Sequence, residues 1–285
     1  MNDELEDYWG SVALEAKDLE KTLRLERWKT AAKNWLAEYA DKRAKDFIMN
    51  VLNEVVKLKE SANVLDVGCG PGKWSIIFAK RYRSVTAIDI SSRMILLAEE
   101  NAEKENLANI NYRVMNVSKL NLPDRTYDLV NCVTVLQHIL NDSNWRMAIQ
   151  EMARVTKNGG YILLFEMAPN FVIKKRTHTL FIRAMRQYTN EFEKAGASLI
   201  YWRAVDLSLP ITFFGLRNYA VSFNKRVYYF MSGRKLFPSD FLSLLSWVAA
   251  LLARSIDYRL AETPLGFLSF GRIMLFQKNK MRFLK

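Results

Sequence analysis

A glycine-rich turn is the feature of this 285-residue chain with the clearest capacity for chemistry. The run Gly68-Cys69-Gly70-Pro71-Gly72 follows a short apolar run, Asn63 to Val67, and precedes a predicted helix. Glycines at a strand-to-helix turn let a ligand approach the backbone closely, although such turns also serve tight packing alone. The spacing differs from two common nucleotide sites. A dinucleotide fold has its third glycine where this chain has Lys73, and a P-loop has a hydroxyl residue where it has Trp74.

Two ionisable side chains follow later strands of the same predicted pattern. His138 comes just after the apolar run Tyr127 to Val135, and Glu166 ends a run that starts at Tyr161. Because ligands bind at the carboxyl ends of parallel strands, both side chains would lie at the mouth of a cleft. A histidine there can take a proton from an acceptor hydroxyl or amine, whereas the alternative is that it caps the strand or packs below the site. Glu166 either lines an acceptor pocket or orients a neighbouring side chain.

Basic and aromatic side chains surround the next predicted helix, Thr179 to Lys194. Arg183, Arg186 and Tyr188 are candidates to bind an anionic acceptor through charge-assisted hydrogen bonds. The alternative interpretation is a solvated basic face of that helix.

The chain has no spacing typical of a disulfide framework or a metal site. Cys69 and Cys132 are its two cysteines, and buried thiols of this kind usually pack as small hydrophobic groups. No group of Cys and His has metal-ligand spacing, and the region of Asp142 offers no carboxylate trio, so we expect no metal.

These candidate residues need a framework that brings strand ends together. Predicted strands alternate with helices five times, which is typical of βαβ units and a parallel sheet with helices on both faces. We therefore expect an α/β fold with a doubly wound, seven-stranded Rossmann-like sheet, a helical N-terminal cover over 11–59, and an insertion between the last two strands. The predicted strands are 63–67, 84–90, 110–117, 127–135, 161–166, 198–203 and 268–277.

The charge of the chain is divided unevenly. The net charge is +12, from 42 Lys and Arg against 30 Asp and Glu. Residues 1–160 carry 23 side chains of each sign, whereas residues 161–285 carry 19 basic and 7 acidic ones. The second half is therefore expected to meet something acidic, such as phosphate, a carboxylate, an anionic membrane surface or nucleic acid.

The run Asp66-Val67-Gly68-Cys69-Gly70-Pro71-Gly72 resembles motif I of the class I S-adenosylmethionine (SAM) methyltransferases. Other segments are similar to that family in the same order along the chain. They are Trp35 to Tyr39, Val85 to Ile90, Asn116-Val117, Tyr127 to His138, and Lys157 to Leu164. The resemblance extends over roughly residues 35–203 and the last strand, and it implies SAM as the cofactor and methyl transfer as the activity.

The resemblance also implies roles for single residues. Motif I would wrap the methionine end of the cofactor, and Asp66 would hold its ammonium group. Asp89 would accept both ribose hydroxyls, a task suited to a carboxylate. Asn116 stands where the family usually has Asp, and it would accept from the adenine amino group through its carbonyl. The predicted cofactor-binding residues are Tyr39, Asp66, Gly68, Cys69, Gly70, Asp89, Ile90, Met94, Asn116, Val117 and Val133.

The predicted insertion, residues 205–265, is basic and aromatic and contains the apolar run 241–253. Three functions are open to it: a lid whose cations hold an acidic acceptor, a membrane-surface contact for a lipid-linked acceptor, or a nucleic-acid surface. The alternative is an ordinary subdomain core or a dimer interface. Nucleic acid is the weaker functional option, because Asn131-Cys132-Val133-Thr134 lacks the Asn/Asp-Pro-Pro-aromatic signature of enzymes that methylate base amino groups.

The sequence thus predicts a SAM-dependent methyltransferase acting on O or N of an anionic small molecule or a lipid- or sugar-linked acceptor. An RNA methyltransferase and a non-catalytic SAM-binding regulator are the alternatives. The expected parts are a helical cover (1–60), a SAM-binding core (61–204), the acceptor insertion (205–265), and the last strand with a basic tail (266–285). The acidic start shows no signal peptide, and the run 241–253 is too short to cross a bilayer. We therefore expect a cytoplasmic protein, with peripheral membrane contact as an option.

Overall fold

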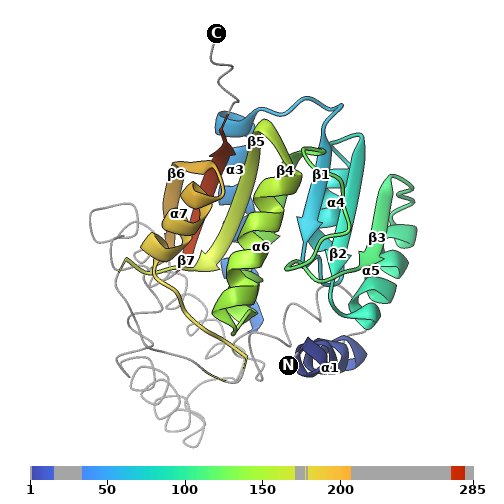
Figure 1. Ribbon diagram of the computed structural model, residues 1–285. Helices are drawn as coiled ribbons and strands as arrows, with labels where there is room; N and C mark the ends of the chain where they lie inside the picture. The colour runs from blue at the N-terminus through green and yellow to red at the C-terminus, as the bar shows by residue number, and fades with distance from the viewer. Residues whose placement is uncertain (1, 16–33, 171–176, 178, 207–270, 280–285) are drawn as a thin grey trace, which may run out of the picture.

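The computed structural model describes residues 2–15, 34–170, 177, 179–206 and 271–279 (Figure 1). Within these residues, one seven-stranded sheet has the order β3-β2-β1-β4-β5-β7-β6. Strands β1 to β5 are parallel, and β7 is antiparallel to both β5 and β6. The strands are β1 (Asn63–Val67), β2 (Ser84–Asp89), β3 (Ile110–Val114), β4 (Tyr127–Val133), β5 (Thr156–Met167), β6 (Ala197–Asp206) and β7 (Gly271–Lys278).

Helices cover both faces of this sheet, with α6 and α7 in front of the strands in Figure 1. The α-helices are α1 (Asn2–Glu15), α3 (Asn34–Val51), α4 (Lys73–Ala79), α5 (Ser92–Lys104), α6 (Asp142–Val155) and α7 (Met185–Lys194). Successive residues of β4 serve opposite faces: Leu129 packs with α3 and α4, and Val130 packs with α6 and α7, both fully buried. A strand buried on both sides is mostly apolar, as β4 is apart from Asp128 and Asn131. The order and directions of the strands confirm the predicted doubly wound α/β fold.

Several element boundaries differ from the expected ones. The helix expected over 179–194 begins only at Met185, because the preceding residues donate hydrogen bonds to the exit of β4 instead of forming a helical turn. The strand expected to reach Val117 ends at Val114. The cover expected over 11–59 consists, in the described residues, of α1, α3 and the short π-helix η2 (Leu52–Val56).

The last two strands place their connection at one edge of the sheet. Asp206, at the end of β6, and Met167, at the end of β5, are both in register with Gly271, the first residue of β7. Residues 207–270 therefore leave from, and return to, the edge at which the parallel strands end. The expected insertion and its apolar run lie outside the described residues, and the domain limits proposed above stay a prediction.

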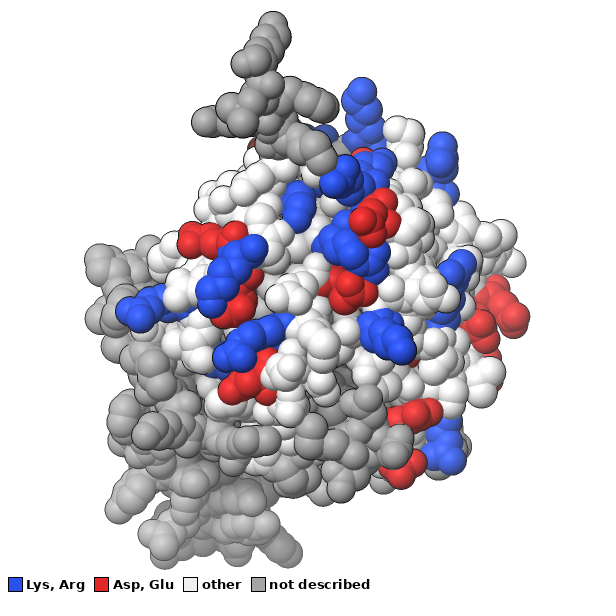
Figure 2. Space-filling view, viewed as in Figure 1, with Lys and Arg blue, Asp and Glu red and all other residues white. Residues whose placement is uncertain are grey.

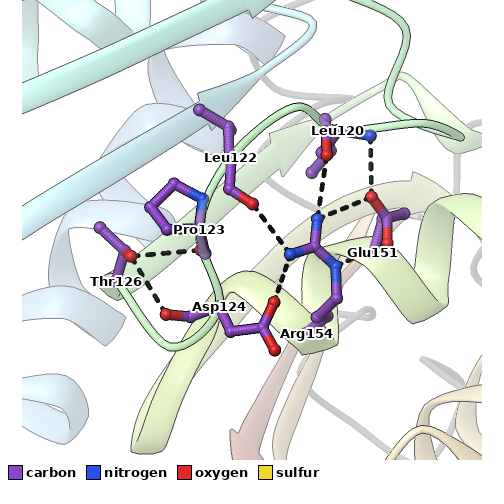
Figure 3. Close-up of polar contacts among 7 residues, drawn as sticks. All are labelled: Leu120, Leu122, Pro123, Asp124, Thr126, Glu151 and Arg154. Carbon is purple, nitrogen blue, oxygen red and sulfur yellow. Dashed lines mark hydrogen bonds and ion pairs between the residues drawn. The ribbon is translucent and has the colours of Figure 1, made fainter.

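A single arginine fixes the loop that leads into β4 (Figure 3). Arg154, near the end of α6, donates from Nε and Nη2 to the Glu151 carboxylate at 2.7 and 2.8 Å. Its Nη1 donates to the Asp124 carboxylate and to the Leu122 carbonyl at 2.5 and 2.8 Å, and Nη2 also donates to the Leu120 carbonyl at 3.0 Å. All five donors of the guanidinium are thus occupied, so the loop and helix α6 hold the start of β4 in place.

The described surface carries charges of both signs. Figure 2 shows Lys and Arg interspersed with Asp and Glu over the face that α6 and α7 cover. From residue 161 onward, the described residues hold six basic and four acidic side chains. Most of the basic excess predicted to meet an acidic partner therefore belongs to segments outside the described residues. None of the helices in the described ranges combines the length and hydropathy that a bilayer crossing requires.

Candidate active site

The glycine-rich turn lies at the carboxyl end of β1 and leads into α4. Gly68, Gly70 and Gly72 all have positive φ angles, of 62°, 51° and 86°. Residues with a Cβ atom rarely adopt this region, so the turn depends on glycine for its backbone shape.

The first two glycines of the turn have different surroundings. A Cβ atom on Gly68 would lie 2.3 Å from a methyl carbon of Val135, so this glycine lets the exit of β4 pack against the turn. A Cβ atom on Gly70 would meet nothing within 4 Å. The backbone at Gly70 therefore faces open space, which is the cradle that close approach of a cofactor requires.

Asp89, at the end of β2, holds the turn from the side. One carboxylate oxygen accepts from the Gly70 N–H at 2.9 Å, and the other accepts from the Ser91 N–H at 2.9 Å. Burial raises the pKa of Asp89 against the lowering effect of these backbone donors. Each oxygen keeps a further lone pair, so the carboxylate can still accept from a pair of hydroxyls, as the resemblance implies for the ribose.

Asp66 lies beneath the turn and is 1% exposed. Its two oxygens accept from the Ser75 hydroxyl at 2.6 Å and from the Asn131 side-chain amide at 2.8 Å. Burial raises the pKa of Asp66 to about 6, although both hydrogen bonds lower it. Asp66 therefore joins β1, α4 and β4 internally, and its expected contact with an ammonium group stays a prediction.

The other predicted cofactor residues surround the same strand ends. Cys69, Met94 and Val117 are buried, and Ile90 and Val133 are partly buried. The Asn116 side-chain carbonyl accepts from the Ser118 N–H at 2.8 Å, so it already closes a local turn. The side chain of Tyr39, within α3, lies outside the description.

Helix α1 lies at the carboxyl ends of the parallel strands and packs against α5 (Figure 1). The rings of Trp9 and His138 meet edge to face, with their centroids 5.1 Å apart. At Gly10, an added Cβ atom would lie 3.3 Å from the Arg93 side chain and 3.8 Å from the Ser91 hydroxyl, so α1 packs tightly against the start of α5. Trp9 was not among the predicted site residues, since it precedes residue 11, where the expected helices begin.

His138 ends the one-turn 3₁₀-helix η3 (Leu136–His138) that follows β4. Its Nδ1 lies 2.6 Å from the Thr179 carbonyl oxygen, which can only accept, so Nδ1 carries the proton. Its Nε2 lies 3.4 Å from the Gln137 side-chain nitrogen. Burial lowers the pKa of His138, while the Thr179 carbonyl raises it. The ring is therefore largely neutral at pH 7, with Nε2 as the basic nitrogen.

Three of the four predicted acceptor residues are enclosed in the protein. Glu166, Arg183 and Tyr188 have exposed fractions of 1%, 0% and 0%. Glu166 accepts backbone hydrogen bonds, Arg183 pairs with Asp142 at 2.8 Å, and Tyr188 packs edge to face on Trp145. These contacts correct the expected acceptor roles to internal ones, because no surface of these side chains is open to an acceptor. Arg186 is exposed, so its expected contact with an acceptor stays a prediction.

In the described ranges, no three His, Cys, Asp or Glu side chains come together as a possible metal site.

Residues 64–160 match the protein family described as a methyltransferase domain. The chain is 32% identical over 123 residues to a ubiquinone biosynthesis O-methyltransferase of Coxiella burnetii. This alignment covers 43% of this chain and 50% of that enzyme. The chain spans about half the length of the curated relatives that it matches.

The fold is also similar to that of solved structures. The structure of the [4+2]-cyclase SpnF superposes on this chain with a TM-score of 0.61 and 18% sequence identity, and the superposition covers 98% of this chain and 97% of that one. A SAM-dependent methyltransferase of Methanosarcina mazei has a TM-score of 0.52 at 21% identity, covering 82% of this chain and 97% of that one. At these identities the likeness is one of fold alone. The family match and the curated relative agree with the predicted resemblance to SAM-dependent methyltransferases over the segment that they cover.

The two glycines provide a matched test of the turn. Gly68→Ala should lower the free energy of unfolding by about 2 kcal/mol or more in urea titrations, because the new methyl group collides with Val135. Gly70→Ala should cost only the backbone strain of about 1 kcal/mol, but it should weaken S-adenosylhomocysteine binding at least about tenfold in calorimetry. Equal effects of both variants on stability and on affinity would contradict this assignment.

Asp89 is the residue on which cofactor affinity should depend most. Asp89→Ala removes a charged acceptor and should weaken SAM binding by about 100-fold in calorimetry, which corresponds to roughly 3 kcal/mol. Asp89→Asn keeps an acceptor for the backbone N–H groups of the turn, so it distinguishes loss of the cofactor contact from misfolding. Glu103→Ala, at an exposed site on α5, is the control. Unchanged SAM affinity in folded Asp89→Ala would remove this residue from the site.

Proposed function

We propose that this chain, whose residues 64–160 form a class I SAM-dependent methyltransferase domain, moves a methyl group from SAM to O or N of a small-molecule acceptor. The acceptor is anionic, or it is linked to a lipid or a sugar. The observation that carries the proposal is the neutral His138 at the exit of β4, whose Nδ1 donates to the Thr179 carbonyl and leaves Nε2 as the basic nitrogen.

SAM, when bound, supplies a methyl group on a sulfonium, which is a good leaving group. The Gly70 backbone and the Asp89 carboxylate would hold the cofactor at the ends of β1 and β2. The acceptor hydroxyl or amine would replace the 3.4 Å contact of the Gln137 amide nitrogen with His138 Nε2, and Nε2 would take its proton as the acceptor attacks. The Thr179 carbonyl would then stabilise the imidazolium through Nδ1. Helix α1, with Trp9 against His138, would exclude water from the reacting groups.

We infer the acceptor class from the basic charge of the second half of the chain and from the similarity to a curated relative. The basic excess of the chain lies after residue 160, and the segment 207–270 begins and ends at the edge that carries His138. The curated relative from Coxiella burnetii is an O-methyltransferase of ubiquinone biosynthesis, which supports a small molecule with an acceptor oxygen. An acidic or lipid-linked small molecule accounts for both observations.

Transfer of label from SAM into a fractionated cell extract tests the reaction and identifies the acceptor class. We expect label in the lipid, glycan or small-metabolite fraction. His138→Gln should reduce transfer by about 100-fold, because proton removal is lost, while S-adenosylhomocysteine affinity changes by no more than about twofold. Label confined to RNA would favour the first alternative, and an RNA affinity that falls steeply with salt would support it. SAM binding without transfer into any fraction would favour a regulator.

The location that we propose is cytoplasmic, with peripheral contact at an anionic membrane surface. The full chain should float with vesicles that contain phosphatidylglycerol at low salt and should be released at about 0.5 M NaCl, because screening removes the attraction of its basic half. Vesicles of phosphatidylcholine alone are the control. Absence of co-flotation at low salt would leave a soluble anionic acceptor as the remaining form of the proposal.

A further inference from the structure

The turn that carries His138 is held from its N–H side by one buried carboxylate. Glu166, near the end of β5, accepts from the Val135 and Leu136 N–H groups at 2.8 Å and from the Gln137 N–H at 3.1 Å. These are the free donors at the start of η3, where a negative charge is favourable. Burial raises the pKa of Glu166 to about 7, against the lowering effect of the three donors.

The same turn is held from its carbonyl side by one buried guanidinium. Arg183 donates from Nη2 to the Ile139 carbonyl at 2.9 Å and from Nη1 to the Leu136 carbonyl at 3.5 Å. Its Nε and Nη2 donate to the Asp142 carboxylate at 3.1 and 2.8 Å. The guanidinium also lies over the rings of Trp145 and Phe181. A positive charge at the carbonyl end of a helical turn again has the favourable sign.

Glu166 and Arg183 act on the imidazole of His138 through the backbone segments to which they are hydrogen-bonded. The Phe181 N–H donates to the Gln137 carbonyl at 2.8 Å, and Arg183 holds the same segment, which brings the Thr179 carbonyl to His138 Nδ1. On the other side, the Met167 N–H donates to Gln137 Oε1 at 3.0 Å, so the Gln137 amide nitrogen faces His138 Nε2. The direction and tautomer of the imidazole therefore depend on the placement of η3 between β5 and residues 179–183.

We propose that Glu166 and Arg183 are positioning residues, which together fix the orientation and the Nδ1–H tautomer of His138. This inference rests on the proposed function for its relevance to methyl transfer. It assigns these two side chains to the reaction through His138, and neither of them touches the acceptor. The charged groups around the turn are Glu166 from β5, Arg183 from the segment before α7, and Asp142 from α6.

Nitrogen NMR of the histidine rings tests this inference without an acceptor. The chain has two histidines, His138 and His178, so His178→Gln in the full chain leaves one ring to observe. In this background we expect His138 as the Nδ1–H tautomer with a pKa below its usual value. Glu166→Gln places an amide donor among three N–H groups, so η3 should loosen, the other tautomer should appear, and the pKa should rise by about half a unit.

The direction of the pKa change separates positioning from simple charge. Because burial raises the pKa of Glu166 to about 7, this carboxyl is mostly protonated where His138 titrates. Loss of its residual charge would leave the pKa of His138 unchanged or lower it, whereas release of the ring toward water would raise it. Arg183→Lys keeps the charge but cannot form the planar contacts to two carbonyls and Asp142, so it should also raise the pKa and mix the tautomers. Because its charge is conserved, this second variant measures geometry alone.

Two outcomes would overturn the inference: an unchanged tautomer and pKa in both variants, or a lowered pKa in Glu166→Gln with no change in Arg183→Lys. Urea titration of each variant establishes that the protein is folded. Failure of the proposed function would appear separately, as normal label transfer by His138→Gln, whatever the NMR of the positioning variants shows.

Discussion

The arrangement of the strand ends depends on the hydrogen bonds that the Glu166 carboxylate accepts from the exit of β4. Burial alone would favour its neutral form, yet three backbone N–H groups of the β4 exit converge on it within 3.1 Å. The exit begins with Thr134 at a φ of 58°, a left-handed conformation that needs such support. Val135, the first residue held, presses against Gly68 and thereby requires a glycine in the turn of β1. The Glu166 side chain thus connects the end of β5 with the exit of β4, and through Val135 with the glycine-rich turn after β1.

Sequence reasoning was most successful where the signal is local. The alternation of apolar strands with helices predicts the sheet, and the run of glycines predicts the turn, whose positive φ angles the structure then shows, because both signals depend on neighbouring residues alone. The Asn131 partner of Asp66 was missed, since it follows from the register of β1 against β4, which no local pattern specifies. Arg183 illustrates the opposite error. A basic residue near a cleft was expected to face an acceptor, but its buried pairing with Asp142 and two carbonyls is a tertiary property.

The fold and the chemistry of this protein are separate questions. A [4+2]-cyclase and a SAM-dependent methyltransferase both have this fold, so the sheet alone does not select a reaction. At the carboxyl ends of the described strands, the chain presents the imidazole of His138, the open backbone of Gly70 and the carboxylate of Asp89. The described residues are nearly balanced in charge, so they alone do not indicate an acidic acceptor.

The antiparallel pairing of β6 and β7 joins the two ends of the segment 207–270. Because Asp206 and Gly271 are paired in the sheet, the two ends of the segment 207–270 are held close together. The entropy of closing such a segment grows only with the logarithm of its length. Insertions, deletions or a wholly different segment at this point therefore cost the core little stability. The register of β6 against β7 therefore marks a point at which the length of the chain can change without altering the pairing of the strands on either side.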